Sequence, residues 1–407
     1  MRTLDARAGS PHTALADVHE LWERLGAARA ELAAGDEGVL REQMALSAIP
    51  SPTGGEAARG AYLAARFDAL GLRVRVDEVG NVLGTRVGAD DDAPVFLCAH
   101  LDTVFPGDAD VTVRRRGARL DGPGIVDNAR GLAGMLALAR VIDGTTLRTR
   151  RPIVFVGTVG EEGCGDLRGA KHLFANVDRT PACCIALDGA GDDRIVHRAL
   201  GVRRFRITYR GAGGHSWAAY GVPNPVHAAG AAAARLAALP LPRQPRTTLS
   251  VCRIGGGISV NSIPEDAWLE VDLRSSSGEV LAGCVADVRA AVHTAAREEN
   301  SRRAPGTEPL SYEVAMIGDR PCGATSEHHP LVRIACAATR AIGRAPELVT
   351  ASTDANVPIS LGIPAIAIGA GGRGGGVHTP AEWYDNSDGS LGLVRALAIV
   401  VAAAELG

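Results

Sequence analysis

The chain has 407 residues, of which 46% are hydrophobic and 22% are charged, a composition typical of a folded globular protein with more than one core. The net charge of −3, without a concentrated basic stripe, argues against nucleic acid as a partner. No run of about 18 apolar residues is present, which argues against a membrane span. Residues 1–36 do not read as a signal peptide, and eight scattered cysteines without a Cys-x-x-Cys pair predict reduced, mostly buried thiols and a cytoplasmic location.

The first half of the chain alternates strands with helices, which predicts a largely parallel sheet covered by helices on both faces. One or two helices are expected within residues 1–48, the second over 38–47, and Gly71 is expected to end a further helix over 56–70. A helix rich in small residues follows at 128–141. The predicted strands cover residues 74–76, 82–87, 95–99, 152–158 and 183–187.

Near residue 200 the pattern changes, because Phe205, Ile207 and Tyr209 alternate with arginines, as in a strand with one solvated face. The elements that follow are a helix over 225–239, strands over 247–254 and 267–275, a helix over 278–299 and a strand over 310–317. This β-α-β-β-α-β order predicts a ferredoxin-like α+β domain over residues 199–318. The α/β pattern then resumes, so residues 1–198 and 319–407 are expected to form one catalytic domain, with helices at 330–342, 355–361 and 388–406 and strands at 347–349 and 365–369.

The apolar run over 95–99 ends at His100, with Asp102 two positions later. On a strand these two side chains project to the same side. Asp102 can therefore accept the second ring N–H of His100 and fix the tautomer that offers the other nitrogen to a metal.

Five side chains lie at or just beyond predicted strand ends, where ligands bind in open α/β sheets. They are His100, Asp127, Glu162, Asp188 and His378. Two imidazoles and three carboxylates, without a thiolate, suit two divalent ions in a hydrolase, with one carboxylate shared between them. Glu161 is left over, and since adjacent residues point in different directions it can act as a general base.

These segments resemble the M20 family of co-catalytic metallopeptidases and amidohydrolases from about residue 45 to the C-terminus. The matching motifs are His100-Leu-Asp102-Thr, Gly122-Pro-Gly-Ile-Val-Asp127, Gly160-Glu161-Glu162-Gly163, Asp188 and His378-Thr-Pro-Ala-Glu382. The resemblance implies two zinc ions, for which cobalt or manganese could substitute. It implies that Asp127 bridges them, that His100 and Asp188 hold one, that Glu162 and His378 hold the other, that Glu161 is the base and that Asp102 supports His100.

The resemblance extends to the inserted domain, which it implies to be a lid and dimerisation domain. Gly213-Gly-His215-Ser resembles the segment whose histidine stabilises the oxyanion in the partner subunit, so a homodimer is expected. Asn261 and Arg274 resemble residues that clamp a substrate carboxylate, although Arg274 shares a strand face with Asp272 and an ordinary ion pair is the alternative. Backbone N–H groups of Gly369 and Gly371 are expected at the same end of the substrate.

The resemblance therefore implies an amide hydrolase acting on a small peptide or an N-acyl amino acid with a free carboxylate. Asn128-Ala129-Arg130-Gly131 departs from many deacylases and, with Ser352-Thr-Asp354-Ala-Asn356, favours the tripeptidase-like branch. An aminopeptidase of the same family and a non-catalytic binding protein stay open as alternatives, and the accepted side chains and acyl group are undecided. A dinucleotide-binding enzyme is disfavoured because the Gly-x-Gly-x-x-Gly pattern at 369–374 is not followed by a helix. A serine hydrolase is disfavoured because no Gly-x-Ser-x-Gly elbow occurs.

Overall fold

The computed structural model describes residues 20–145 and 147–406, and its backbone contacts divide the chain into two compact units. The main unit comprises Met1–Ala199 and Ala324–Gly407, and the inserted unit comprises Leu200–Gly323. The predicted insert of 199–318 overlaps the inserted unit, which runs further because its last strand continues to Arg320. The predictions for residues 1–19 lie outside the described residues.

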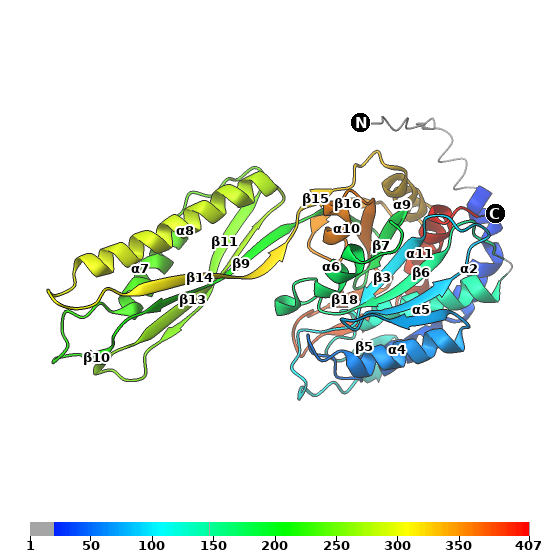
Figure 1. The fold of residues 1–407 in the computed structure, drawn as a ribbon. Helices are drawn as coiled ribbons and strands as arrows, with labels where there is room; N and C mark the ends of the chain where they lie inside the picture. Colours follow the sequence, from blue (N-terminus) through cyan, green and yellow to red (C-terminus); the bar gives the residue numbers. More distant parts are fainter. Residues whose placement is uncertain (1–19, 146, 407) are drawn as a thin grey trace. The chain divides into compact units, whose positions relative to one another are not determined.

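The main unit is built on a mixed, mostly parallel sheet of nine strands in the described ranges, coloured in Figure 1 from blue to orange. Its strand order is β1-β2-β6-β3-β7-β17-β8-β15, with β16 beside β8. The strands are β1 (Arg73–Val76), β2 (Val82–Arg86), β3 (Val95–His100), β6 (Ile153–Thr158), β7 (Cys183–Leu187), β8 (Arg194–Ala199), β15 (Gly323–Ala324), β16 (Glu347–Ala351) and β17 (Ala365–Ile368). The central strands β6, β3, β7 and β17 are parallel, so their carboxyl ends meet at one edge.

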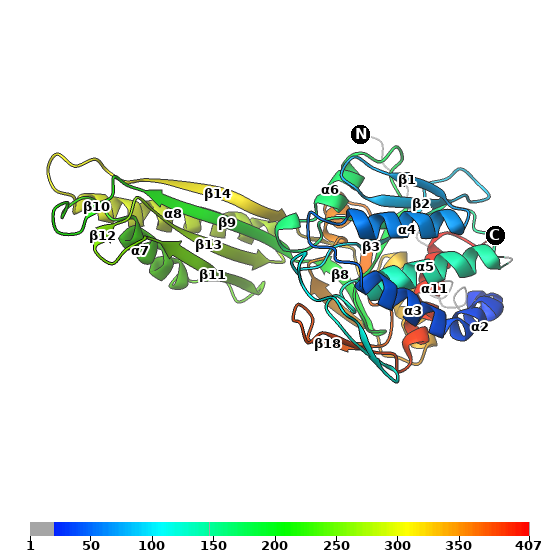
Figure 2. The same cartoon turned by 90° about the horizontal axis from the view of Figure 1, so that it is seen from below.

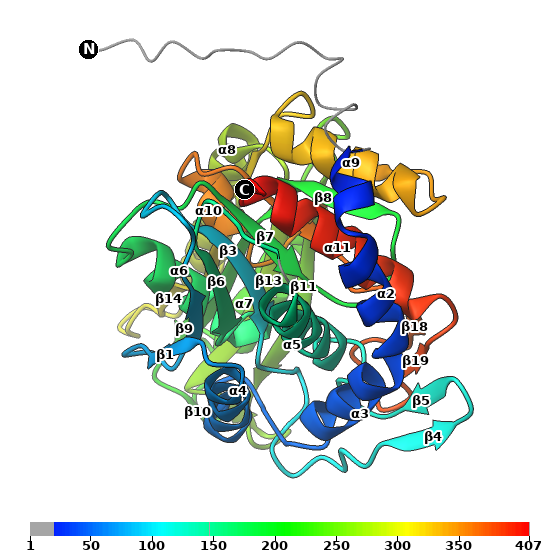
Figure 3. The same cartoon turned by 90° about the vertical axis from the view of Figure 1, so that its right-hand side faces the viewer.

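Helices cover both faces of this sheet because its central strands are buried on both sides. Val95, Leu97 and Ala99 of β3 belong to one apolar core, and Phe96 and Cys98 belong to another. Figure 3 shows α5 and α11 on one side of the central strands and α6 and α10 on the other. The helices are α2 (Gly26–Ala34), α3 (Asp36–Ser47), α4 (Ala57–Ala69), α5 (Ala129–Gly144), α6 (Arg168–Ala175), α9 (Pro330–Ala341), α10 (Asn356–Ser360) and α11 (Gly389–Ala403), with a short 3-10 turn at Gly163–Gly165.

A small antiparallel sheet of the main unit, in the order β18-β19-β5-β4, was not predicted from the sequence. Its strands β4 (Arg114–Arg116), β5 (Arg119–Asp121), β18 (Arg373–Gly375) and β19 (Trp383–Asp385) have only three residues each, too few to show an alternating pattern. This sheet joins the segment before Asp127 to the segment around His378.

The inserted unit has the predicted β-α-β-β-α-β order, and Figure 2 shows its antiparallel strands side by side as β14, β9, β13 and β11. Tyr209, Val271 and Val292 pack in the core between this sheet and the helices α7 and α8. A two-stranded antiparallel sheet, β10 with β12, completes the unit. The elements are β9 (Gly201–Arg210), β10 (Gly214–His215), α7 (Pro225–Ala237), β11 (Thr247–Gly256), β12 (Ser262–Ile263), β13 (Asp266–Ser275), α8 (Gly278–Ser301) and β14 (Ser311–Arg320).

The predicted mostly parallel α/β fold with a smaller α+β insert is therefore confirmed. No helix in the described part of the chain is long and apolar enough to cross a membrane. All eight cysteines are free thiols, but only Cys98, Cys183, Cys184 and Cys284 are buried, fewer than the predicted majority.

Candidate metal centre

The five predicted metal ligands come together at the carboxyl edge of the main sheet. His100 is the last residue of β3, and Asp188 directly follows β7. Glu162 lies in the turn after β6, and Asp127 directly precedes Asn128, the N-cap residue of α5. His378 follows β18 in the left-handed backbone region, at φ 66°. The main sheet and the small antiparallel sheet together therefore bring side chains up to 278 positions apart in the sequence to one place.

Asp127 lies at the middle of this cluster. His100 Nε2 is 2.8 Å from Asp127 Oδ1, whereas His378 Nε2 is 3.2 Å from Asp127 Oδ2. Glu162 Oε1 is 3.0 Å from His378 Nε2, and Asp188 Oδ1 is 3.9 Å from His100 Nε2. The two oxygens of Asp127 thus face two different histidines, each with a further carboxylate beside it.

Asp102 lies behind His100, but its main-chain carbonyl is the nearer acceptor. His100 Nδ1 is 3.0 Å from the carbonyl oxygen of Asp102 and 3.6 Å from its Oδ1. A carbonyl oxygen only accepts, so Nδ1 carries a proton, and Nε2 is the ring nitrogen that faces the cluster. The ring nitrogens of His100 are therefore used as predicted, with Nδ1 donating and Nε2 toward the cluster. The donor's main acceptor is the Asp102 carbonyl, because the Asp102 carboxylate accepts backbone N–H groups instead.

The carboxylate of Asp102 instead holds the backbone that carries Glu161 and Glu162. The N–H of Glu161 donates to Asp102 Oδ1 at 2.9 Å, and the N–H of Glu162 donates to Oδ2 at 3.0 Å. The hydroxyl of Thr53 donates to the same Oδ2 at 2.8 Å. Burial alone would raise the pKa of Asp102, but the interaction with His100 and these donors lower it to about 2.

Two further buried carboxylates, which the sequence analysis did not assign to the site, anchor neighbouring loops. Glu382 accepts hydrogen bonds from the N–H groups of Gly124, Val126 and Asp127 at 2.8 to 3.0 Å. Glu56 accepts the N–H of Gly160, just before Glu161, at 3.0 Å. Glu382 lay inside a recognised motif, whereas Glu56 carried no signal of this role.

The buried carboxylates of the cluster repel one another, and the two histidines do not balance all of their negative charge. Burial and the charge of Asp127 raise the pKa of Asp188 well above its usual range, and the same causes raise the pKa of Glu162 to about 7. Asp127 and Glu162 in turn raise the pKa of His378 to about 9. Without a cation the cluster therefore retains protons, which bound divalent ions would displace.

The residues present fit two divalent metal ions. His100, Asp127 and Glu162 each offer a ligand atom within 4.8 Å of the others. Asp127 can serve two ions because its oxygens face opposite histidines, and each histidine has a carboxylate of its own, Asp188 or Glu162. Imidazole and carboxylate donors suit zinc, cobalt and manganese alike.

Glu161 and Asp354 add two buried acids to this edge of the sheet. Glu161 is 5% exposed, and Asp354 is 4% exposed. Asp354 Oδ2 accepts a hydrogen bond from the Thr158 hydroxyl at 2.5 Å, but its Oδ1 has no hydrogen-bond partner among the residues that the structure describes. Burial and the charge of Glu161 raise the pKa of Asp354 to about 7.

The inserted unit places His215 on β10 and Asn261 directly before β12, the strand that pairs with β10. His215 pairs with Ser262, and the N–H of Ser216 donates to the Asn261 carbonyl at 2.9 Å. The N–H of Trp217 donates to His215 Nδ1 at 3.2 Å, so neutral His215 carries its proton on Nε2. His215 therefore presents a hydrogen-bond donor.

The predicted carboxylate clamp of Asn261 and Arg274 does not form within one chain. Arg274 lies at the far end of β13, where its Nε and Nη2 contact the two oxygens of Asp272 at 2.6 and 3.2 Å. Asn261 precedes the start of β13 at Asp266, and the eight steps from Asp266 to Arg274 span about 26 Å. The alternative ion pair is thus what the structure shows for Arg274.

Of the two expected backbone donors, Gly371 has its N–H engaged within the chain. The N–H of Gly371 donates to the Gly191 carbonyl at 2.9 Å, so it is not available to a substrate. Both glycines are required by close backbone packing, because a Cβ atom would lie 2.2 Å from the Ala190 carbonyl at Gly369 and 2.1 Å from the Gly389 carbonyl at Gly371.

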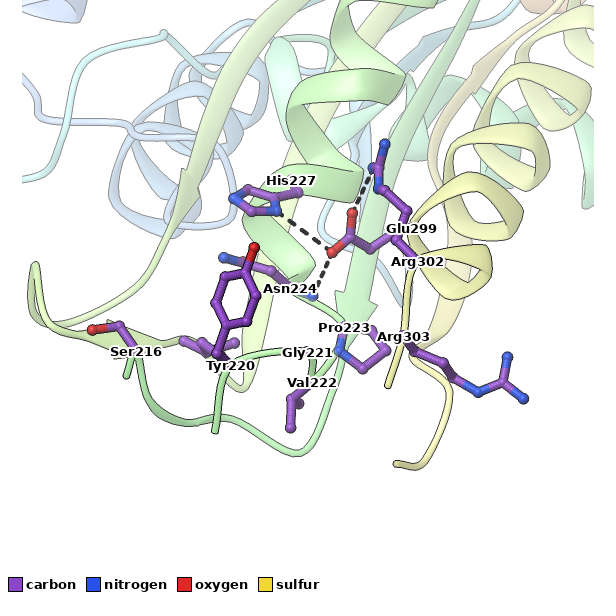
Figure 4. A pocket seen from close by; sticks show the side chains of 11 residues that line it. Ser216, Tyr220, Gly221, Val222, Pro223, Asn224, His227, Glu299, Arg302 and Arg303 are labelled. Carbon is purple, nitrogen blue, oxygen red and sulfur yellow. Dashed lines mark hydrogen bonds and ion pairs between the residues drawn. The ribbon is translucent and has the colours of Figure 1, made fainter. Parts of the chain in front are cut away.

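A cavity of about 600 Å³ in the inserted unit lies beside the β10–β12 pair, and Figure 4 shows Glu299 among its lining residues, with dashed contacts to Asn224, His227 and Arg302. Glu299 accepts the N–H of Asn224 at 2.8 Å and contacts Arg302 at 2.7 Å and His227 at 3.5 Å. Burial would raise the pKa of Glu299, but these partners lower it. Its charge is therefore already compensated, and the cluster ties α7 to α8.

Known proteins resemble this chain over most of its length. Residues 96–403 match the profile of Peptidase family M20/M25/M40. The YqjE protein of Bacillus subtilis is 28% identical over 382 residues, which cover 90% of this chain and 97% of YqjE. The crystal structure of aminopeptidase PepT from Bacillus cereus has a TM-score of 0.71 at 26% identity, covering 91% of this chain and 99% of PepT. The fold also matches YXEP of Bacillus subtilis, described as a dinuclear metal-binding peptidase, with a TM-score of 0.64 at 16% identity, covering 91% and 99% of the two chains.

Proposed function

The chain belongs to Peptidase family M20/M25/M40, and on that premise we propose that it is a two-metal hydrolase of amide bonds. Its substrates would be small peptides or N-acyl amino acids with a free carboxylate. The observation that carries the proposal is the position of Asp127 between His100 and His378, each with its own carboxylate. Such a shared carboxylate suits a pair of ions acting on one substrate.

In this proposal His100 and Asp188 hold one zinc ion, Glu162 and His378 hold the other, and Asp127 is shared. Cobalt or manganese would be substitutes. When bound, divalent ions polarise the substrate carbonyl and lower the pKa of water. Asp102, Glu382 and Glu56 keep the ligand loops in place through their backbone hydrogen bonds.

Glu161 is the proposed general base. It is buried and neighbours the ligand Glu162, and its backbone N–H is held by Asp102. Glu161 would take a proton from the attacking water and later return it to the leaving amine. One positioned carboxyl group can act first as general base and then as general acid.

His215 is the proposed oxyanion donor, supplied by the partner subunit of a homodimer. Its neutral ring keeps the Nε2 proton, which suits a donor to a developing negative charge. If Asn261 and Arg274 both contact one substrate, they must come from different copies, because one chain keeps them at opposite ends of β13. The free thiols support the cytoplasm as the compartment.

An aminopeptidase that anchors the substrate amine is the second candidate. The 26% identity with aminopeptidase PepT over nearly the full length of both chains favours it. Turnover would then depend on a free amine and tolerate a blocked carboxylate.

The test is turnover of dipeptides, tripeptides and N-acyl amino acids by zinc-loaded protein, followed by mass spectrometry. Glu161→Gln should lose at least about 10²-fold in kcat, as expected for a general base, while it keeps two bound metals. The exposed Glu327→Gln variant is the matched control and should be unchanged. A wild-type protein that holds two metals and cuts no member of the panel would contradict the proposal.

A further inference from the structure

A second cavity, of about 740 Å³, lies within the main unit and adjoins the candidate metal centre. Asp127 and Asp188 line it, and so does Arg373. A substrate held at the metals through these two carboxylates could therefore extend toward a guanidinium group.

The backbone of Arg373 is fixed between the two loops that carry these ligands. The N–H of Gly191, three positions after Asp188, donates to the Gly372 carbonyl at 3.2 Å. Gly374 packs against Val126, next to Asp127, so closely that a Cβ atom would lie 2.7 Å from Val126 Cγ2. The position of Arg373 is therefore coupled to the metal loops.

Arg373 is also the only residue with a side chain in the run from Gly371 to Gly376. Its guanidinium makes no hydrogen bond or ion pair with the residues that the structure describes. The other cations of the cavity are engaged, since Arg344 lies 3.0 Å from both Asp192 and Asp388 and Arg194 lies 3.9 Å from Glu347.

The acidic residues around the cavity form no ion pair with Arg373 within the part of the chain that the structure describes. Asp192 is paired with Arg344, and Asp193 lies near the buried guanidinium of Arg395. Asp385 is the cross-strand neighbour of Arg373, and the charge of Arg373 contributes to lowering the pKa of Asp385. The two side chains form no ion-pair contact among the described residues, and Asp385 Oδ1 accepts the N–H and the hydroxyl of Ser387. Val126, Val377 and Trp383 provide an apolar wall. The cavity thus offers one unpaired cation beside apolar surface.

We propose that Arg373 binds a carboxylate of the substrate and makes this enzyme selective for acidic ligands. The guanidinium fork matches a carboxylate with two parallel hydrogen bonds, and the apolar wall suits the carbon chain between that carboxylate and the amide. Arg274, the arginine expected in this role, is occupied by Asp272. The inference rests on the proposed function for the reaction, but it names a different residue as the anchor.

The experiment compares two matched substrate pairs. One pair is a cleaved dipeptide and its C-terminal amide, and the other differs only by glutamate against glutamine. Wild type, Arg373→Gln and Arg373→Lys are measured for kcat/KM on each member. Arg194→Gln is the control, because it removes the same charge from the same cavity.

Wild type should prefer the carboxylate member of one pair, and that pair identifies whether a terminal or a side-chain carboxylate is bound. Arg373→Gln should reduce this preference roughly 10- to 100-fold through KM, as for a lost hydrogen-bonded ion pair, and leave the amide member unchanged. Arg373→Lys should keep part of the preference, and Arg194→Gln should keep nearly all of it. Equal loss in Arg194→Gln and Arg373→Gln, or turnover by wild type without any preference, would overturn the inference, while the proposed hydrolysis of amide bonds stands.

If wild type cuts no substrate, the proposed function fails. The role of Arg373 is then tested separately by calorimetric titration of the same dipeptides into wild type and Arg373→Gln. Carboxylate-dependent binding that is lost in the variant supports the inference. Equal binding by both proteins, or no binding by wild type, overturns it.

Discussion

The two units of the chain hold their candidate functional residues in opposite ways. In the main unit the ligand loops are fixed by hydrogen bonds from backbone N–H groups to the buried carboxylates of Asp102, Glu56 and Glu382. In the inserted unit the exposed residues His215 and Asn261 lie at the short β10–β12 pair, and Arg274 forms an ion pair with Asp272.

This difference shows which part of the chemistry is complete within its own unit. The main unit brings five ligands and a base together through long-range contacts, so it should bind metal without help. The inserted unit offers a hydrogen-bond donor at a surface, so its contribution depends on what that surface meets. The following changes test this contrast.

The largest effect should come from Asp127→Asn. This change weakens the carboxylate shared by both metal positions, so turnover should fall by about 10³-fold or more, since several kcal/mol of charge stabilisation depend on the ions. Turnover and bound metal, measured by mass spectrometry, should fall together. An Asp127→Asn variant that keeps both metals and most of its activity would contradict the proposal that Asp127 is a metal ligand.

His215→Ala should have a smaller effect and a different signature. Loss of one oxyanion donor costs about 10²-fold in kcat, and the bound metal should be unchanged because no ligand is altered. Mixing this variant with Glu161→Gln should restore activity, since one site of a mixed dimer would receive both intact residues. If mixing restores nothing although mixed dimers form, His215 does not act across subunits.

Glu382→Gln should weaken metal binding without removing a ligand. The variant loses one of the oxygens that hold the loop before Asp127, and outer-shell changes of this kind lower metal affinity roughly 10- to 100-fold. Competition with a chelator measures the affinity, and Glu327→Gln again serves as the exposed control. Unchanged affinity would show that the loop keeps its place without Glu382.

Asp354 gives a pH-dependent prediction for metal-free protein. Its pKa is about 7 in the fold and lies near 4 in unfolded chains, so the folded state binds the proton more tightly and stability is lost as the pH rises from about 4 to 7. Asp354→Asn cannot ionise, so its Tm relative to wild type should increase by roughly 3 °C or more between pH 5 and pH 8. Thermal unfolding at several pH values checks this, and a constant difference would contradict it.

The smallest effect on turnover should come from Arg274→Gln. This arginine already pairs with Asp272 and is partly exposed, and exposed ion pairs contribute about 1 kcal/mol or less. We expect kcat/KM to change by less than about threefold on every substrate of the panel. A large loss confined to carboxylate substrates would instead make Arg274 the anchor in place of Arg373.

The sequence predicted those parts of the site that follow from strand ends. His100 and Asp188 end or follow apolar runs, so the topology of a parallel sheet was enough to place them together. Periodicity also predicted the ferredoxin-like insert, because Phe205, Ile207 and Tyr209 alternate cleanly.

Contacts between distant loops were beyond such reasoning. Nothing local marks Glu56 as the acceptor for Gly160, which lies 104 positions away, and three-residue strands such as β18 are too short to show a period. Arg274 shows a different limit, since its motif predicted a substrate contact and the structure shows an ion pair with Asp272, so the substrate contact stays a prediction.

The glycine run around Arg373 has a consequence for how this protein could change over time. A Cβ atom at any of the five glycines would come within 3.0 Å of another atom: 2.1 Å at Gly371, 2.3 Å at Gly372, 2.7 Å at Gly374, 2.8 Å at Gly375 and 2.7 Å at Gly376. Within this segment, residue 373 is therefore the position that accepts a side chain without such a clash, and Arg373 lines the cavity. A library randomised at residue 373 alone should yield folded proteins with altered ligand preference, whereas libraries at the flanking glycines should yield mainly unfolded ones.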